Sequence, residues 1–551
     1  MIDNTQVLIV GGGPVGLAAA IELGSRGVKT TLVEAADRIG RAPRAKTTNV
    51  RTCEHLRRWG ILDHLRAASP LGLEYPSDIS FATRLTGIEI ARIPNAANCS
   101  PARDNLYSAH AQWIPQYKLE AVLLEHAQNI PGVRIEFGAR LTELSSHESE
   151  VISTIEHQGV LNAVSSQYVI GADGARSTVR GLIGANMTGK GGLSVNRMLI
   201  FRQKGLRKRT KLGPAIMYWL VNESIPAVLG PMDDDDVWYI NGPESFMSRL
   251  PPVELIREAT GCSDIEPEIL AIEDWKAHEL IANKYNQGRI FLAGDACHLH
   301  PPYGGYGMNL GVADAVDIGW KIAAVISGWA GSDILSSYEI ERRAVHERVV
   351  EEAVLNHSVR TVDLVTPNLE DLSEKGRAAR EACAKKIYEH KTREFKSLGI
   401  VLGSRYEKSP IISFEDPVLL SKEDSSTYIP SSRPGSLAPH AWLHHGQDYG
   451  SSLYDHFGHG YTLLSFVGAS AETVELRDFA AKEKIPLSVV IVDDAKIAAL
   501  YEKKYVLIRP DQYVAWRGDV IKEYLEIFGT LTGRRFLGGR GNELSGTSSL
   551  I

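Results

Sequence analysis

The stretch QVLIVGGGPVGLAAAIELGSRGVKTTLVE, residues 6–34, decides the fold class of this chain. A β-forming apolar run leads into a turn with the spacing G-x-G-x-x-G, and a helix-forming segment then leads to a second apolar run that ends at Glu34. This spacing lets backbone amides approach a pyrophosphate at a helix N-terminus, while the acid can hold ribose hydroxyls. The stretch predicts a strand, helix and strand unit that binds a dinucleotide such as FAD or NAD, rather than a plain glycine-rich turn.

A second segment joins an acid to a glycine-rich loop much later in the chain. RIFLAGD, residues 289–295, has the pattern of a buried strand that ends at Asp295. A loop rich in proline and glycine follows, and a helical pattern of apolar residues starts at Asn309; we call residues 294–309 the GD loop. A strand-end carboxylate can accept hydrogen bonds from a ribityl chain, and a helix start suits an anion that forms on a ring system.

A third segment of the same kind lies between these two. YVIGADGARSTVR, residues 168–180, places Asp173 and Gly174 after an apolar run and before a basic helix start; we call residues 173–180 the DG motif. The alternative interpretation is three unrelated turns, each capped by an aspartate or a serine. Their occurrence in this order favours a single shared site.

In this order, the three segments resemble the fingerprints of the single-component FAD-dependent aromatic hydroxylases, which share the fold of p-hydroxybenzoate hydroxylase. The resemblance covers residues 5–345 and includes RAPRAKTTNVRTCEHLRRWGI (41–61) and IPQYKLEAVLLEHA (114–127). It implies an α/β fold with a Rossmann-like FAD-binding domain, an inserted antiparallel-sheet substrate domain and a helical segment. The C-terminal third resembles the thioredoxin-like domain of the phenol hydroxylase and polyketide hydroxylase branches.

The resemblance assigns cofactor contacts to positions of this chain. The first loop would bind the ADP half of FAD, and the GD loop would hold the ribityl chain and the isoalloxazine. The implied FAD-binding residues are Gly11, Gly13, Pro14, Val15, Gly16, Glu34, Ala35, Arg44, Gln116, Asp173, Gly174, Asp295, Pro302, Gly305, Gly307, Met308 and Asn309. NADH or NADPH would dock near Asp173 and Arg180, with a helix-face salt bridge as the alternative role of Arg180.

The implied activity is hydroxylation of a phenolic or similarly activated aromatic ring, a small aromatic substrate. NADH or NADPH would reduce the flavin, and reaction with O2 would give a C4a-hydroperoxide that transfers one oxygen atom. Such a site mainly positions the substrate against the flavin and excludes water, and it needs no nucleophilic side chain. One alternative is a flavin halogenase or reductase on the same scaffold, although the halogenase signature W-x-W-x-I-P has no counterpart in the sequence. Another is a flavin-binding sensor or assembly protein, which would bind without turnover.

Residues 186–280 are expected to form the substrate-binding sheet, since runs such as AIMYWLV and VWYING have the pattern of antiparallel strands. Candidates to line an aromatic pocket, with core packing as the alternative for each, are Tyr218, Trp219, Trp238 and Tyr239. His298 and His300 could relay a phenolic proton, or could simply be histidines satisfied beside the loop. The candidates for the chemistry itself are His298, Pro302 and Tyr218.

The expected domain order follows from these segments. Residues 1–185 and 281–345 form the two parts of the FAD-binding domain, with an excursion into the substrate domain near 75–110, and 186–280 form the substrate domain. A helical segment (346–407), a linker (408–440) and a thioredoxin-like domain (441–551) complete the chain. No cysteine follows Cys383, so the last domain has no CxxC pair for dithiol chemistry and is expected to serve structure or assembly, with a homodimer as one option.

The bulk composition limits the class of partner. The chain has 551 residues, 44% of them hydrophobic, and a formal net charge of −7, which fits an ordinary globular protein of several domains and argues against a nucleic-acid partner. Five scattered cysteines without a CxxC pair argue against disulfides and against a zinc site, so no metal is expected. No apolar run is long enough for a membrane span and no export signal is recognised, so a cytoplasmic protein is expected.

Overall fold

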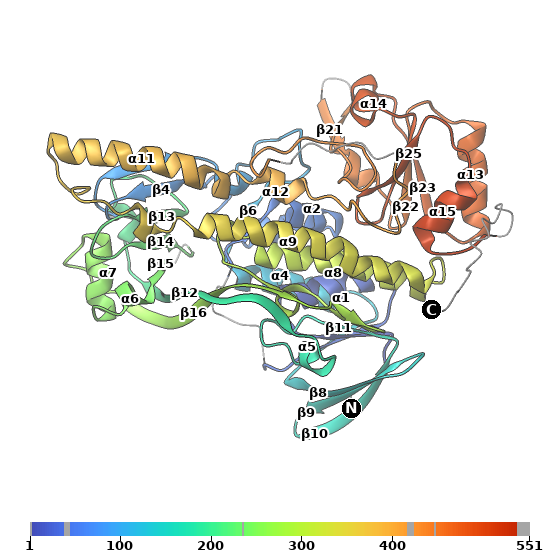
Figure 1. The fold of residues 1–551 in the computed structure, drawn as a ribbon, viewed down its shortest axis with the longest axis horizontal. Helices are drawn as coiled ribbons and strands as arrows, with labels where there is room; N and C mark the ends of the chain where they lie inside the picture. The colour runs from blue at the N-terminus through green and yellow to red at the C-terminus, as the bar shows by residue number, and fades with distance from the viewer. Residues whose placement is uncertain (1–2, 38–44, 234–235, 416–423, 446–447, 537–551) are drawn as a thin grey trace, which may run out of the picture.

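The computed structural model describes residues 3–37, 45–233, 236–415, 424–445 and 448–536. Figure 1 shows an eight-stranded sheet at one end of the molecule, a C-terminal domain at the other, and two long helices, α8 (Gly307–Ile326) and α9 (Ser337–His357), between them. The expected α/β class is confirmed. None of the helices in the described ranges has the length and apolar character that a membrane span requires.

A six-stranded sheet carries the first motif, with the strand order β17-β18-β11-β1-β2-β7. The strands from β18 to β7 run parallel, and β17 is antiparallel to β18. β1 is buried along its whole length, as expected for a parallel strand that is covered on both faces. The bounds are β17 Asn286–Gln287, β18 Ile290–Leu292, β11 Tyr168–Gly171, β1 Val7–Val10, β2 Thr30–Glu34 and β7 Val133–Phe137.

Helix α1 (Pro14–Gly24) follows β1 directly and packs against α8 and α4 (Gln116–Gln128). Proline at its first position is compatible with a helix start, because the missing amide hydrogen would have no intrahelical partner there. A separate three-stranded antiparallel sheet precedes the DG motif in the chain, formed by β8 Ala139–Ser146, β9 Val151–His157 and β10 Val160–Ser166.

The eight-stranded sheet has the order β19-β16-β12-β15-β14-β13-β4-β5 and is antiparallel except for the parallel pair of β13 and β4. Most of its strands come from the region expected to bind substrate, while β4 and β5 come from the segment near 75–110. The bounds are β19 His298–Leu299, β16 Glu268–Ala282, β12 Met187–Arg202, β15 Val237–Pro243, β14 Ala227–Pro231, β13 Met217–Leu220, β4 Ile79–Ala82 and β5 Glu89–Ile93.

Side chains alternate between the two faces of this sheet, as the period of a strand requires. One face packs on α6 (Glu244–Met247) and α7 (Pro252–Thr260), and its core includes Leu199, Leu229 and Ile240. The opposite face is covered in part by α11 (Glu374–Phe395).

The C-terminal domain has a four-stranded sheet of order β23-β22-β24-β25, in which β22 and β23 are parallel and the remaining pairs antiparallel. Helices follow β22, β23 and β25, whereas β24 leads directly to β25, which is the order of a thioredoxin fold. The bounds are β22 Tyr461–Ser465, α13 Ala471–Lys482, β23 Leu487–Ile491, α14 Ala495–Tyr501, β24 Tyr505–Ile508, β25 Val514–Gly518 and α15 Tyr524–Thr532.

A buried ionic network attaches this domain to the long helices. Arg509, just after β24, pairs with Glu341 of α9 (2.6 Å) and with Asp317 of α8 (3.2 Å). Lys321 of α8 binds the same two carboxylates. The network is almost fully buried, so its charges must be matched for the domains to dock.

Candidate active site

The three motifs meet at one edge of the six-stranded sheet. They follow β1, β11 and β18, which are neighbours and run in the same direction, so their carboxyl ends lie together. In register, Val10 pairs with Gly171 and Gly171 pairs with Leu292. The crevice beyond the carboxyl ends of such strands is where open α/β sheets bind dinucleotides. Segments that are far apart in the sequence therefore form one site.

The glycines of the first loop let the backbone approach its neighbours closely. Gly11 has φ +111°, and a Cβ there would lie 2.3 Å from the carbonyl oxygen of Ala172. A Cβ at Gly16 would lie 1.9 Å from the carbonyl oxygen of Gly11. Around the Cβ position of Gly13, in contrast, the described residues place no atom within 4 Å. The start of α1 has no side-chain cap, so its amides are available to a phosphate.

Glu34 lies beside this loop at the end of β2. Its carboxylate accepts hydrogen bonds from the amides of Gly12 (2.6 Å) and Ala36 (2.8 Å). These contacts fix the acid next to the start of α1, where a ribose would lie. The glycine cradle, the uncapped helix start and the acid together fit the ADP half of FAD.

Val15 connects the first loop to the GD loop. A Cβ at Gly294 would lie 2.9 Å from Val15 Cγ2, and a Cβ at Gly311 would lie 2.5 Å from the same atom. Only glycine at both positions allows the start of α1 to pack against the GD loop and the first turns of α8. Two loops that are distant in sequence can thus hold the two ends of one elongated cofactor.

The DG motif lies between them and is tied to the GD loop. Asp173 accepts a hydrogen bond from the amide of Val179 (3.0 Å) in the short helix α5, Thr178–Leu182. Arg180 donates a hydrogen bond to the carbonyl of Ala296 (3.0 Å) in the GD loop. Both side chains therefore have structural contacts in this structure, and their docking of NADH or NADPH stays a prediction.

The GD loop crosses the edge of the sheet from β18 to α8. Asp295 and Pro302 are exposed, whereas Asn309 in the first turn of α8 is buried. The side-chain amide of Asn309 donates hydrogen bonds to the carbonyls of Thr47 (2.9 Å) and Gly305 (2.7 Å), which fixes the turn. The start of α8 has no side-chain cap, so its amides and its dipole favour an anionic group.

Gln116 lies next to the segment that was expected to meet the flavin. Its side-chain carbonyl accepts a hydrogen bond from the amide of Ala45 (3.0 Å), and its side-chain amide donates to Glu120 (2.7 Å). Arg44 itself lies outside the described residues. Gln116 thus fixes the backbone at Ala45, the residue that follows Arg44.

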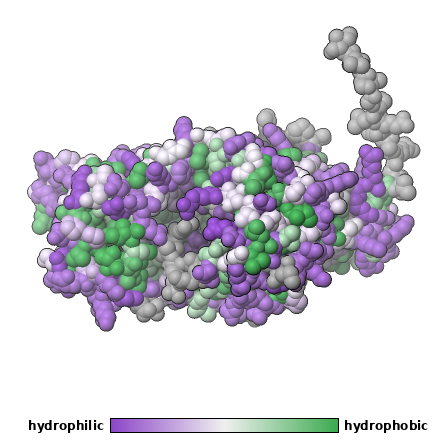
Figure 2. Space-filling view, turned by 90° about the horizontal axis from the view of Figure 1, so that it is seen from below, coloured by the Kyte–Doolittle hydropathy of each residue, from purple (hydrophilic) through white to green (hydrophobic). Residues whose placement is uncertain are grey.

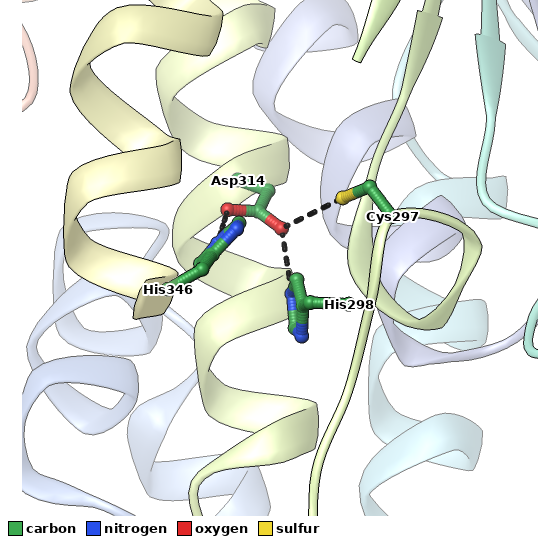
Figure 3. A group of neighbouring side chains, drawn as sticks. All are labelled: Cys297, His298, Asp314 and His346. Atoms are coloured by element: carbon green, nitrogen blue, oxygen red, sulfur yellow. Dashed lines mark hydrogen bonds and ion pairs between the residues drawn. The ribbon is translucent and has the colours of Figure 1, made fainter. Parts of the chain in front are cut away.

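A buried polar cluster joins the GD loop to α8 and α9. Figure 3 shows its members Cys297, His298 and His346 pointing toward Asp314. Asp314 of α8 lies at its centre and accepts hydrogen bonds from the amide of Gly294 (3.0 Å) and from Arg342 Nε (2.7 Å). Nε2 atoms of His298 (3.1 Å) and His346 (2.8 Å) contact the same carboxylate. Burial raises the pKa of Asp314, but the charges and hydrogen bonds of His346, Arg342 and His298 outweigh it and hold this pKa well below its usual range.

Four side chains of this cluster are of types that bind metal ions. Candidate ligand atoms of Cys297, His298, Asp314 and His346 lie within 4.8 Å of one another. The guanidinium of Arg342 already balances the charge of Asp314, however, and would repel a cation at this place. We therefore interpret the cluster as a hydrogen-bonded support of the GD loop, and it gives His298 a supporting role.

Comparisons with known proteins agree with this geometry. The family described as FAD binding domain matches residues 4–353, and the family described as aromatic-ring hydroxylase, C-terminal, matches residues 431–529. The chain belongs to the FAD-dependent aromatic-ring hydroxylases. FAD is therefore the cofactor of this hydroxylase, and the sequence-based recognition of the family is confirmed.

Individual relatives cover nearly the whole hydroxylase. It is 31% identical to the tetracenomycin B2 monooxygenase-dioxygenase of Streptomyces olivaceus, over 93% of this chain and 95% of that protein. It is 30% identical to the FAD-dependent monooxygenase apdD of Emericella nidulans, over 95% of this chain and 89% of that protein. RebC with bound 7-carboxy-K252c is a similar solved structure, with 34% identity and a TM-score of 0.88 over 97% of this chain and 99% of that one. The hydroxylase is thus an FAD-dependent monooxygenase.

The four aromatic candidates of the substrate sheet lie on different faces. Tyr218 and Trp238 belong to the core against α6 and α7, and the Tyr218 hydroxyl donates to the carbonyl of Gly213 (2.8 Å). Trp219 and Tyr239 lie on the opposite face, which Tyr303 of the GD loop contacts. The structure thus gives Tyr218 a place in the core, away from the GD loop, and leaves Trp219 and Tyr239 as the pocket candidates.

The face of the hydroxylase seen in Figure 2 has a recess near its middle, between the end with the eight-stranded sheet and the rest of the molecule.

Within the GD loop, His300 Nδ1 lies 2.7 Å from the carbonyl of Pro301. Burial lowers the pKa of His300 to about 4, so its ring is neutral at pH 7. A relay of a phenolic proton by His300 stays a prediction, as does the contact of Pro302 with a bound ring.

Two supporting residues were missed by sequence reasoning. Asp314 is completely buried within the apolar pattern of α8, and an acid at such a position is a signal that could have been noticed. Thr47 contacts the GD loop through its backbone carbonyl, for which no side-chain signal exists.

Proposed function

We propose that this hydroxylase uses NADH or NADPH as electron donor and adds one oxygen atom from O2 to a phenolic or similarly activated aromatic ring. One observation carries the proposal. Tyr303 of the GD loop contacts Trp219 on the substrate sheet, with ring centroids 6.3 Å apart. The loop expected to hold the isoalloxazine therefore adjoins an apolar, aromatic face.

The substrates named for relatives support this class. A 28% identical relative from a Pseudomonas species is phenol 2-monooxygenase, and another from Delftia acidovorans is 2,4-dichlorophenol 6-monooxygenase. Other relatives are named aklavinone 12-hydroxylase RdmE, from Streptomyces purpurascens, and putative polyketide hydroxylase, from Streptomyces halstedii. The phenols named for the first two relatives carry a hydroxyl on an aromatic ring, which is the feature we transfer to this chain.

The residues of the chain would bind FAD, orient the substrate ring and exclude water from the site. We propose that the first loop and Glu34 hold the ADP half of FAD, and that Asp295 and the start of α8 hold its ribityl chain and ring system. When bound and reduced, FAD would supply the chemistry by forming a C4a-hydroperoxide with O2. The apolar face around Trp219 would keep the reacting ring dry, since water promotes loss of the activated oxygen.

The proposal is tested with the purified chain reconstituted with FAD. A set of phenols and polycyclic phenolic compounds is screened for faster oxidation of NADH and NADPH, and products are analysed by mass spectrometry under 18O2. We expect one labelled oxygen atom in the product of at least one phenol. Stimulated oxidation that yields only hydrogen peroxide would contradict the proposal, and a halogenated product in the presence of chloride or bromide would favour a halogenase.

A further inference from the structure

Lys46 lies one residue before the strand that contacts the GD loop. This strand, β3 (Thr47–Thr48), pairs with β6 (Gln112–Trp113). The Thr47 carbonyl accepts a hydrogen bond from Asn309, and a Cβ at Gly305 would lie 3.5 Å from Thr47 Cβ. Lys46 is therefore held at the border between the GD loop and the substrate sheet.

The ammonium group of Lys46 points at the substrate sheet. Its Nζ lies 3.9 Å from the ring centroid of Tyr239 in β15, a cation–π contact. Among the described residues no carboxylate forms an ion pair with it. Burial lowers the pKa of Lys46 to about 8, because desolvation disfavours the charged form. The group remains largely protonated at neutral pH and lacks a counter-ion in the described part of the chain.

Tyr239 adds a second polar group at the same place. The residue is 2% exposed, and its buried hydroxyl has no hydrogen-bond partner among the described residues. Its ring lies across Gly230 of the neighbouring strand, where a Cβ would come within 2.9 Å of the hydroxyl. Burial raises the pKa of Tyr239, so the group stays a hydroxyl that can donate a hydrogen bond.

The surroundings of this pair are otherwise apolar. Ile200, Trp219 and Met232 lie on the same face of the sheet, together with Tyr303 from the GD loop. Buried polar groups in proteins nearly always have a partner, and leaving one unpaired costs free energy. The buried Tyr239 hydroxyl without a partner and the half-buried Lys46 ammonium without a counter-ion among the described residues lie beside one apolar region. They indicate a place for a ligand with a hydrogen-bond acceptor, and the cation favours an anionic one.

We propose that Lys46 and Tyr239 bind the acidic oxygen of the aromatic substrate, so that the hydroxylase selects rings that carry an anionic oxygen. This inference rests on the proposed function, since it concerns the substrate of the same site. Both groups would donate hydrogen bonds to that oxygen, and the ammonium would supply its counter-charge. The oxygen would belong to a phenolate or to a carboxylate on the ring.

The test uses the full chain reconstituted with FAD and follows ligand binding by the change in the flavin absorption spectrum. The probes are pentafluorophenol, which is ionised at neutral pH, its methyl ether pentafluoroanisole, and benzoate. We expect the wild-type chain to bind at least one of the two anions more tightly than the ether. The preferred anion tells a phenolate site from a carboxylate site.

Substitution of the pair should remove this preference. Lys46→Met and Tyr239→Phe should each weaken binding of the preferred anion about tenfold, the effect of one lost hydrogen bond to a charged group, and change binding of the ether little. Lys46→Arg should retain most of the preference because it keeps the charge. Lys385→Met and Tyr388→Phe, on the exposed side of α11, are matched controls that should leave all three affinities unchanged.

The outcomes separate this inference from the proposed function. An unchanged anion preference in Lys46→Met and Tyr239→Phe would overturn the inference, even if wild-type protein hydroxylates phenols. Loss of FAD affinity in these variants without loss of anion preference would also overturn it, because the pair would then serve the cofactor. A preserved anion preference in wild type without any oxygenated product would instead refute the proposed function alone.

Discussion

The guanidinium of Arg180 donates a hydrogen bond to the backbone carbonyl of Ala296, at 3.0 Å, and so joins the DG motif to the GD loop. Both segments follow neighbouring parallel strands, yet neither strand by itself fixes the distance between the loops. Arg180 therefore sets the relative position of two segments that would contact one cofactor.

Arg180→Gln should weaken FAD binding about tenfold, because the GD loop loses a hydrogen bond from a charged donor. Titration of the FAD-free chain with FAD, followed by quenching of flavin fluorescence, measures the effect. Arg176→Gln, at an exposed position of the same motif, is the control and should bind FAD normally. Unchanged FAD affinity together with a raised KM for NADH or NADPH would show that Arg180 docks the nicotinamide instead.

Two glycines of the first loop should respond differently to alanine. Gly16→Ala places a Cβ 1.9 Å from the Gly11 carbonyl oxygen. This variant should have a free energy of unfolding lower by about 1–3 kcal/mol and should also bind FAD more weakly. Gly13→Ala has room for its Cβ, so it should fold normally but bind FAD about tenfold more weakly, because the methyl group obstructs the pyrophosphate. Thermal unfolding and FAD titration of both variants would test this. Full FAD affinity in Gly13→Ala would place the pyrophosphate elsewhere.

Glu22 should make stability depend on pH in the acid range. Burial raises the pKa of this carboxyl, but the charges of Arg58 and Arg26 and hydrogen bonds from Arg58 and Trp59 outweigh burial and lower it from 4.5 to about 2. Because the folded-state pKa is the lower one, this stabilisation is present above pH 4.5 and is lost as the pH falls toward 2. It amounts to about 3 kcal/mol.

Glu22→Gln should accordingly lower the free energy of unfolding at neutral pH by about 3–5 kcal/mol, because it leaves two largely buried arginines without their carboxylate. The difference from wild type should shrink as the pH approaches 2. Urea unfolding at several pH values measures it. A difference between the two proteins that does not vary with pH would rule out this ion pair as the source.

The docking of the C-terminal domain should depend on Arg509. Arg509→Met leaves Glu341 and Asp317 with less positive charge around them and should cost about 3–5 kcal/mol. Lys503→Met removes an exposed pair with Asp519 in the same domain and should cost at most about 1 kcal/mol. Equal thermal stability of the two variants would mean that the network does not hold the domains together.

The local patterns of the first loop and of the other two motifs could be predicted from the sequence, because each combines an apolar strand with turn residues within a short stretch. Gly11, Gly16 and Glu34 lie where the spacing indicates. The thioredoxin-like order of the last four strands also agrees with the pattern of apolar runs after the linker.

Other features depend on tertiary packing and could not be read from one sequence. Tyr218 and Trp219 are adjacent, and strand alternation requires them to face opposite sides, but only the packing of α6 and α7 decides which side is the core. The contact of Lys46 with Tyr239 likewise joins positions almost two hundred residues apart in the chain. A sequence shows that both residues exist but not that they meet.

If the three motifs build one flavin site, the purified, FAD-free chain should bind FAD there, and titration with FAD measures this binding. We predict saturation at one FAD per chain with a bound-flavin absorption spectrum, and much weaker binding by Asp295→Ala, which removes the carboxylate at the ribityl position. A chain that stays colourless with excess FAD, or an Asp295→Ala variant that binds as tightly as wild type, would contradict the account.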